Sequence, residues 1–212
     1  MTTYLHAFAR SRLSHVWLGL ALSWLLGQPL AAQSDDWQLA KTENDIEVYT
    51  RKVPGEPLKA FRVVTTFDAR AEDILAVITD ADQGDQWQDR CTESRLLEQQ
   101  DADHYLAYVR IDTPWPLQDR DLVVRVVVKR LADRTVVQMT NAPSAYPEQA
   151  DLVRMPGYQG RWVLIPQAGG RTRVISEGQT SPGGSIPDWL ANAAVIDSPL
   201  ATMSNLRAQV EG

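Results

Sequence analysis

The hydrophobic period of the chain changes along its length, and this change limits the fold more than any other feature. Between residues 105 and 179, apolar side chains alternate with a period of two over several short segments, with no helical segment between them. Such β-branched runs indicate an antiparallel sheet with one buried face. After residue 182 the apolar positions recur every three or four residues, which indicates one long amphipathic helix at the C-terminus.

The expected elements follow from these periods and from turn residues. Pro54-Gly55-Glu56-Pro57 separates the first two strands, and a short helix at 71–80 has acidic residues in its first turn. The sequence therefore predicts an α+β domain in which a curved antiparallel sheet of six to seven strands packs on the last helix. The strands are expected at 46–51, 58–67, 105–112, 122–129, 135–139, 161–165 and 172–179, and the long helix at 186–210.

Pro199 lies inside the expected long helix. Proline lacks a backbone donor, and its ring clashes with the preceding turn. We therefore expect a kink or a split at this point, with Asp197 or Ser198 capping a restarted second half. The bend is either a hinge for motion or a static curve that fits the sheet.

The N-terminus has the three parts of a secretory signal peptide. It carries Arg10 and Arg12 without an acidic residue, and Val16–Leu26 is then an apolar run of eleven residues that a polar, proline-containing break follows. A transmembrane helix needs roughly 20 apolar residues, so this run is too short for a good anchor. We expect cleavage after Ala32 and a periplasmic or secreted domain at 33–212. The alternative is a buried N-terminal helix.

Charge limits the partners of this chain. The chain has 21 basic and 27 acidic residues, and without residues 1–32 it would have 19 and 27, a formal charge of −8. Nucleic acids and anionic lipid head groups attract proteins through Lys and Arg, which neutralise phosphate. We therefore expect no nucleic-acid partner and no membrane binding through charge.

Three segments carry recognisable motifs, in a fixed order along the chain. Ile111–Asp121 contains Pro-Trp-Pro-Leu-Gln-Asp-Arg-Asp, Gly160–Pro166 reads Gly-Arg-Trp-Val-Leu-Ile-Pro, and Pro182–Asn192 precedes a helix that closes with Leu206-Arg207. They resemble the Pro-x-Pro-x-x-Asp-Arg-Asp turn, the penultimate strand and the start and close of the C-terminal helix of START domains, the steroidogenic-acute-regulatory-related lipid-transfer domains. The resemblance spans residues 37–211.

The resemblance implies a helix-grip fold, in which the sheet grips the long helix around a hydrophobic tunnel. It also implies binding and carriage of one lipid or other hydrophobic molecule, with the C-terminal helix and a neighbouring loop serving as lid and as the region of transient membrane contact. Each methylene withdrawn from water gains about 0.8 kcal/mol, so such a tunnel retains its ligand without any charged contact.

The residues expected to bind the ligand are inward-facing positions of the strands and of the helix. They are Tyr105, Ala107, Val109, Val124, Val126, Met139, Trp162, Trp189, Ala193, Ile196 and Leu200. Trp162 and Trp189 are candidates for the ligand wall, with core packing as the alternative. Several sterol-carrying members of the family place an acidic residue and an arginine in the tunnel, and the matching positions, Ala107 and Val126, are apolar. Arg125 is expected to point to the other face.

Two features of the Pro-Trp-Pro segment have a structural and a functional interpretation. We expect Arg120 and Asp121 to tie the turn to the sheet through charge-assisted hydrogen bonds, with orientation of a ligand head group as the alternative. Trp115, between two prolines, is expected to be a packed or lid-edge aromatic.

Groups for catalysis or metal binding are few. His104 is the only histidine after residue 32 and lies in a polar turn, and the single cysteine, Cys91, is expected to be a small half-buried apolar residue. The acidic run at 80–85 lacks the glycine and closing carboxylate of a calcium loop. We expect no metal, no cofactor and no catalysis.

Two alternatives remain. One is a module that binds a protein partner without a ligand. The other is an enzyme of the aromatase/cyclase type, which belongs to the same superfamily. The groups that could supply its acid/base chemistry are Tyr105, Tyr108, Arg161, Ser176 and Glu177.

Overall fold

A computed structural model describes residues 36–56, 58–184 and 186–212, so the expected signal peptide lies outside the described residues. The two α-helices are α1 (Ala71–Thr79) and α2 (Asp188–Glu211), and the short 3-10 helices are η1 (Ala81–Gln86), η2 (Pro143–Ala145) and η3 (Ala168–Gly170). The strands are β1 (Gln38–Glu43), β2 (Ile46–Arg51), β3 (Ala60–Phe67), β4 (Cys91–Gln99), β5 (His104–Ile111), β6 (Arg120–Arg130), β7 (Thr135–Asn141), β8 (Val153–Arg154), β9 (Gly157–Pro166) and β10 (Thr172–Ser181).

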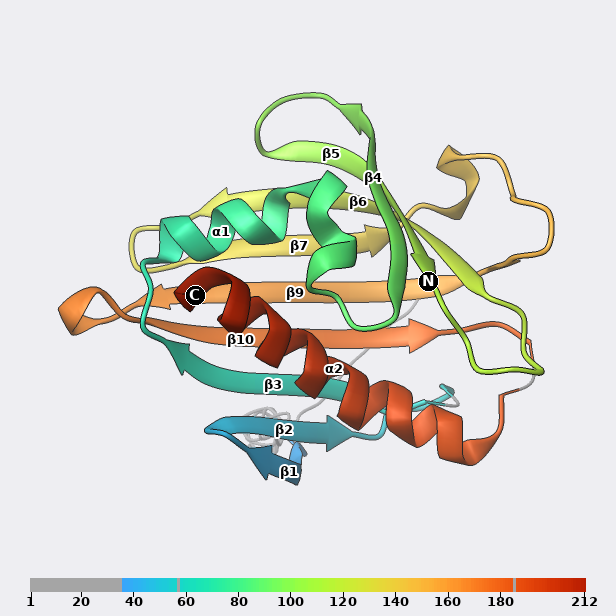
Figure 1. Ribbon diagram of the computed structural model, residues 1–212, viewed down its shortest axis with the longest axis horizontal. Coiled ribbons are helices and arrows are strands. Elements are labelled where there is room, and N and C mark those ends of the chain that lie inside the picture. Colours follow the sequence, from blue (N-terminus) through green and yellow to red (C-terminus); the bar gives the residue numbers. More distant parts are fainter. Residues whose placement is uncertain (1–35, 57, 185) are drawn as a thin grey trace, which may run out of the picture. The chain divides into compact units, whose positions relative to one another are not determined.

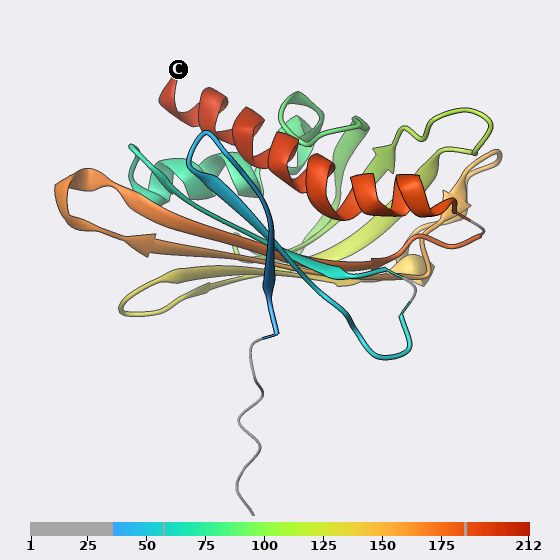
Figure 2. The same cartoon turned by 90° about the horizontal axis from the view of Figure 1, so that it is seen from below.

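The described strands form one sheet, and the helices α1 and α2 lie on the same side of it. The strand order is β1-β2-β3-β10-β9-β7-β6-β5-β4, all antiparallel, and the short β8 pairs with β6 in parallel (Figure 1). The sheet curves, and α2 runs across its concave side over β2 and β3 (Figure 2). This is the helix-grip arrangement that the sequence predicts. None of the described helices is both long and apolar enough to cross a membrane.

The main core lies between the concave side of the sheet and the inner face of α2. Phe67 of β3, Leu164 of β9, and Met203 and Leu206 of α2 are completely buried there. The expected helical stripe is therefore confirmed for the second half of α2. Burial of each such side chain contributes about 1.5–3 kcal/mol relative to an exposed position.

The sheet contains more strands than the six to seven that the sequence predicts. The predicted strands are present, but β1, β4 and β8 were missed. β1 and β4 form the two edges of the sheet, and most of their side chains are exposed or only half-buried. They therefore show no apolar alternation. Both contain register shifts, which are common at sheet edges.

Of the kink or split predicted for the long helix at Pro199, the split is absent. α2 is continuous through Pro199, so no second half begins at Asp197 or Ser198, although the helix bends along its length (Figure 2). Proline removes one backbone hydrogen bond. Leu200 and Met203, which follow it, are buried in the core, and this packing stabilises the helix beyond the proline.

Candidate functional site

A cavity of about 600 Å³ lies between the concave side of the sheet and α2. Its walls come from β5, β6 and β9, from the first half of α2 and from the segment between α1 and β4. The volume falls within the range of pockets that hold one small organic molecule. The protein's own side chains therefore do not fill the interior at this place.

Four cross-strand pairs of β5 and β6 form the main wall of the cavity. Every second residue of a strand points to the same face, so each pair places two side chains on the cavity side. Going along the strands, the pairs are Tyr105 with Val126, Ala107 with Val124, Val109 with Leu122, and Ile111 with Arg120. The first three pairs are largely apolar, and the fourth ends in a cation.

Most of the residues predicted to bind a ligand line this cavity. They are Tyr105, Ala107, Val109, Val124, Val126, Met139, Trp162 and Ala193. Ala107 and Val126 place apolar side chains on the cavity wall, and Arg125 is exposed on the other face, as predicted. That these residues bind a ligand stays a prediction.

The ligand-binding positions that the sequence predicts on the long helix line the cavity only in part. Ala193, Asp197 and Ala201, four residues apart, line the cavity, whereas Ile196 and Leu200 do not. The latter two lie on the side of α2 that packs against the core. A spacing of three or four residues identifies a face but not which neighbour that face meets. The side chain of Trp189 lies outside the described part of the structure.

Three aromatic residues on the cavity wall, Phe61, Trp87 and Tyr158, were missed by the sequence reasoning. Trp87 lies in the turn after η1, where no periodic signal exists, and packs edge-on against Trp162 with ring centroids 5.8 Å apart. Tyr158 lies N-terminal to the predicted strand at 161–165, because β9 in fact begins at Gly157. A side chain at Gly160 would overlap the Tyr158 ring, so this glycine makes room for it.

Arg120 and Asp121 play different parts, although the sequence reasoning treated them as one structural pair. Arg120 faces the cavity and is only 6% exposed. Its Nη1 donates to the Gln118 carbonyl at 2.6 Å, while its Nε is buried without an acceptor among the described residues. Burial lowers the pKa of the Arg120 guanidinium from its ordinary value.

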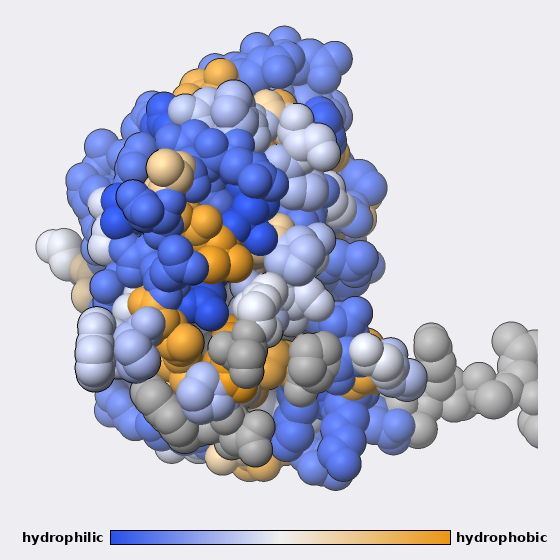
Figure 3. Space-filling model, turned by 90° about the vertical axis from the view of Figure 1, so that its right-hand side faces the viewer, coloured by the Kyte–Doolittle hydropathy of each residue, from blue (hydrophilic) through white to orange (hydrophobic). Residues whose placement is uncertain are grey.

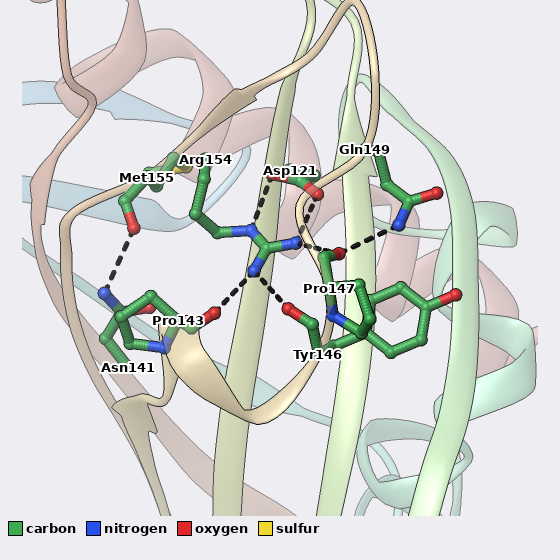
Figure 4. A network of polar contacts seen from close by, with 8 residues as sticks. All are labelled: Asp121, Asn141, Pro143, Tyr146, Pro147, Gln149, Arg154 and Met155. Carbon is green, nitrogen blue, oxygen red and sulfur yellow. Dashed lines mark hydrogen bonds and ion pairs between the residues drawn. The ribbon is translucent and has the colours of Figure 1, made fainter.

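Asp121, on the opposite face of β6, has a structural part, but it holds a different segment from the Pro-Trp-Pro turn that the sequence predicts. It accepts two hydrogen bonds of 2.8 Å from Nε and Nη2 of Arg154, and both side chains are almost completely buried (Figure 4). Arg154 also donates to the carbonyls of Pro143, Tyr146 and Pro147. The pair therefore fastens the segment between β7 and β8 to the outer face of the sheet.

A second, smaller core lies under this segment. Leu106, Tyr108 and Val123 are buried there, and the Tyr146 ring covers Tyr108 with centroids 5.5 Å apart. Arg95 lies over both rings and donates to the Tyr146 hydroxyl at 2.8 Å.

Of the groups considered for catalysis, only Tyr105 and Ser176 line the cavity. Burial raises the pKa of Tyr105 to about 12, so its phenol is neutral at physiological pH. Tyr108 belongs to the outer core, and Glu177 is engaged by Arg62 at 2.6 Å and Arg161 at 2.5 Å. The cavity wall thus offers neutral hydroxyl groups from this set.

Cys91, at the start of β4, also lines the cavity and is half-buried, as predicted. Its Sγ donates to the Glu93 carbonyl at 3.3 Å. Burial raises the pKa of the thiol from 9.0 to about 11. The side chain is therefore an uncharged part of the wall.

The loop between β5 and β6 borders the cavity through Thr113 and Pro114. Asp119 links the two ends of this loop, because its carboxylate accepts hydrogen bonds from the Thr113 backbone N–H at 3.1 Å and from Arg110 at 2.7 Å. These bonds, the Arg110 bond foremost, lower the pKa of Asp119. Trp115, within the loop, is 92% exposed, so it is not a packed aromatic. The end of the molecule that carries this loop shows apolar side chains between hydrophilic ones (Figure 3).

Comparisons with known proteins agree with this geometry. The START domain family model matches residues 26–209. An uncharacterised protein of Pseudomonas aeruginosa is 40% identical over 195 residues, which cover 92% of this chain and 95% of that protein. The crystal structure of a STAR-related lipid transfer protein fragment from Xanthomonas axonopodis is 35% identical with a TM-score of 0.78, and the match covers 84% of this chain and 100% of that chain.

A eukaryotic relative is more distant. The phosphatidylcholine transfer protein of Mus musculus is 28% identical over 174 residues, which cover 79% of this chain and 80% of that protein. The family model spans the whole sheet and nearly all of α2, including the three motifs noted in the sequence. The chain therefore belongs to the START domain family.

Proposed function

We propose that the protein binds one lipid or other hydrophobic small molecule in its cavity and carries it without changing it chemically. The observation that carries the proposal is the cavity of about 600 Å³, whose main wall contains three largely apolar strand pairs. Two relatives are named as lipid transfer proteins, which supports the same function.

The physical basis is the removal of apolar ligand surface from water. About 0.8 kcal/mol per methylene is enough to hold a long acyl chain or a fused-ring body without a specific polar contact. The phenols on the wall suit this task, because burial raises the pKa of Tyr105 and of Tyr158 to about 12 and keeps both neutral. These neutral phenols and the apolar strand pairs impose little desolvation cost on the apolar part of a ligand.

The proposal includes transient contact with a membrane through α2 and the loop between β5 and β6. Trp115 supports this part, because tryptophan prefers the membrane–water interface and this side chain is almost fully exposed. The acidic charge of the protein disfavours anionic lipid surfaces, so the contact would rest on apolar and aromatic groups.

The proposal also places the protein outside the cytoplasm, in the periplasm or the medium. Its support is the N-terminal sequence alone: two arginines, the apolar run Val16–Leu26 and the small residues that end at Ala32. Mass spectrometry of protein expressed in a bacterial host, after cell fractionation, tests it. We expect a mature chain beginning at Gln33 outside the cytoplasm, and an uncleaved cytoplasmic chain would refute export.

The central experiment identifies the bound molecule. Folded protein is extracted into organic solvent, and the extract is analysed by mass spectrometry beside an extract of heat-denatured and refolded protein. In parallel, fluorescent fatty-acid and phospholipid analogues are titrated into the protein. We expect a stoichiometric lipid in the first extract or saturable binding of an analogue. An empty extract together with no binding would refute the proposal.

A further inference from the structure

The cavity ends in a buried cation that the structure leaves without a carboxylate. Arg120 occupies the last of the four strand pairs, opposite Ile111, and is 6% exposed. Its Nη1 donates a hydrogen bond to a backbone carbonyl, that of Gln118. Nε is buried and has no acceptor among the described residues.

The carboxylates around this end are committed to other cations. Asp121 is held by Arg154, and Asp119 accepts from Arg110 and from a backbone N–H. Asp112, in the cavity wall, pairs with Arg90 at 3.2 Å. Asp119 is also the one carboxylate whose charge acts appreciably on Arg120. Among the described residues, no ion pair joins a carboxylate to the Arg120 guanidinium.

A buried guanidinium without an anion is energetically costly, because transfer of the charge from water is not repaid by an ion pair. Arginine does not escape the cost by losing its proton, since it stays charged in proteins. An anion that enters the cavity would repay the cost, and guanidinium groups bind carboxylate and phosphate with two parallel hydrogen bonds.

We propose that Arg120 binds the anionic head group, a carboxylate or a phosphate, of an amphipathic ligand whose apolar part lies along the strand pairs from Ile111 to Tyr105. The inference rests on the proposed function and makes its ligand class narrower. The cation and the apolar wall lie on the same two strands, so one molecule contacts both. The head group then faces the end of the cavity bordered by Thr113 and Pro114.

The test compares ligands that share a chain and differ in charge. The full protein is titrated with oleate and oleyl alcohol, and with oleoyl lysophosphatidate and monooleoylglycerol, at neutral pH and constant salt. A charge-assisted hydrogen bond in a buried site corresponds to about tenfold or more in affinity. We expect the wild type to prefer at least one anionic member by about that factor. Preference within the first pair assigns a carboxylate, and preference within the second pair alone assigns a phosphate.

The variant Arg120→Met keeps the length of the side chain and removes the charge. We expect it to lose the preference for the anion while its affinity for the neutral partner changes little. The matched control is Arg125→Met, on the same strand but exposed on the other face, which should keep the preference. Thermal denaturation checks the folding of both variants.

The outcomes separate the two proposals. Equal binding of the charged and neutral members of both pairs by the wild type would overturn the anionic head group and leave hydrophobic-ligand binding intact. Retention of the preference in Arg120→Met would also overturn it. Binding of no member of either pair would overturn the anionic head group, and only an empty extract as well would overturn hydrophobic-ligand binding. The wild-type comparison decides the matter even if Arg120→Met fails to fold.

Discussion

Arg120 and Asp121 are neighbours in the chain but lie on opposite faces of β6. Arg120 lines the cavity, whereas Asp121 is completely buried on the outer face and pairs with Arg154. One short motif therefore serves two surfaces of the same sheet. The charge on one side maintains the fold, and the charge on the other side remains available to the cavity, so substitutions at the two positions should have different consequences.

Removing the Asp121 carboxylate should destabilise the protein strongly. In Asp121→Asn the buried Arg154 loses the carboxylate with which it pairs, and breaking a buried ion pair typically costs 3–5 kcal/mol. The free energy of unfolding from urea denaturation measures the loss. The control is Asp133→Asn, which removes an exposed pair with Arg134 and should cost about 1 kcal/mol or less.

The double variant Asp121→Leu with Arg154→Met makes the same prediction more specific. Because it removes both charges, its loss in free energy of unfolding should be smaller than the summed losses of the single variants Asp121→Leu and Arg154→Met. An Asp121→Asn protein as stable as Asp133→Asn would show that the pair does not fasten the segment between β7 and β8.

Adjacent valines of β6 distinguish the cavity from the packed core. Val124 lines the cavity, whereas Val123 is completely buried in the outer cluster with Tyr108. Val124→Phe should retain the stability of the wild type and lower ligand affinity at least several-fold, because the larger ring occupies ligand space. Val123→Phe should cost about 1–3 kcal/mol through overpacking. Urea denaturation and titration with a fluorescent lipid analogue measure the two effects. Equal destabilisation by both variants would mean that the cavity closes in solution.

Much of the fold can be predicted from the sequence, because its central strands and α2 each bury one face. The seven predicted strands are those with an apolar alternation, such as β5 and β6. The edge strands β1 and β4 were not predicted, because a strand with mostly exposed side chains shows no alternation of apolar and polar residues. The continuity of α2 through Pro199 depends on tertiary packing, which local rules do not include.

The site was predictable where strand periodicity decides it and not elsewhere. Alternation placed Tyr105, Ala107 and Val126 on the cavity side correctly. Periodicity along α2 could not say which side of the helix meets the cavity, so Ile196 was placed wrongly. The lack of an ion pair at Arg120 could not be predicted either, because it depends on which carboxylates the neighbouring arginines already bind.

Cys91 provides a chemical probe of cavity occupancy. The thiolate is the reactive form, and burial raises the pKa of this thiol from 9.0 to about 11, so at neutral pH the thiolate fraction falls about a hundredfold. Alkylation of the folded protein should therefore be slow at neutral pH and should accelerate as the pH rises toward 11. Labelling is followed by mass spectrometry, with urea-unfolded protein as the fast control. A saturating ligand should slow the reaction further, because Cys91 lines the cavity. Labelling as fast as in urea would contradict both the burial and the pKa.

Trp115 should govern exchange with membranes rather than affinity for the ligand. Its side chain is 92% exposed in the loop that borders the cavity, and interfacial tryptophans partition into the head-group region. In Trp115→Ser, transfer of a fluorescent lipid between phosphatidylcholine vesicles should slow several-fold, while the equilibrium affinity in solution stays unchanged. Zwitterionic vesicles are the appropriate acceptor, because the acidic protein is repelled by anionic surfaces.

Leu131→Ser is the matched control for this variant. Leu131 is also an exposed apolar residue, at 54%, but it lies in the turn between β6 and β7, at the other end of β6 from the Trp115 loop. Removing it lowers the exposed apolar surface without touching the border of the cavity, so transfer should proceed at the wild-type rate. If both variants slowed transfer equally, the effect would come from general surface hydrophobicity. If neither did, the loop between β5 and β6 would not be the part that meets the membrane.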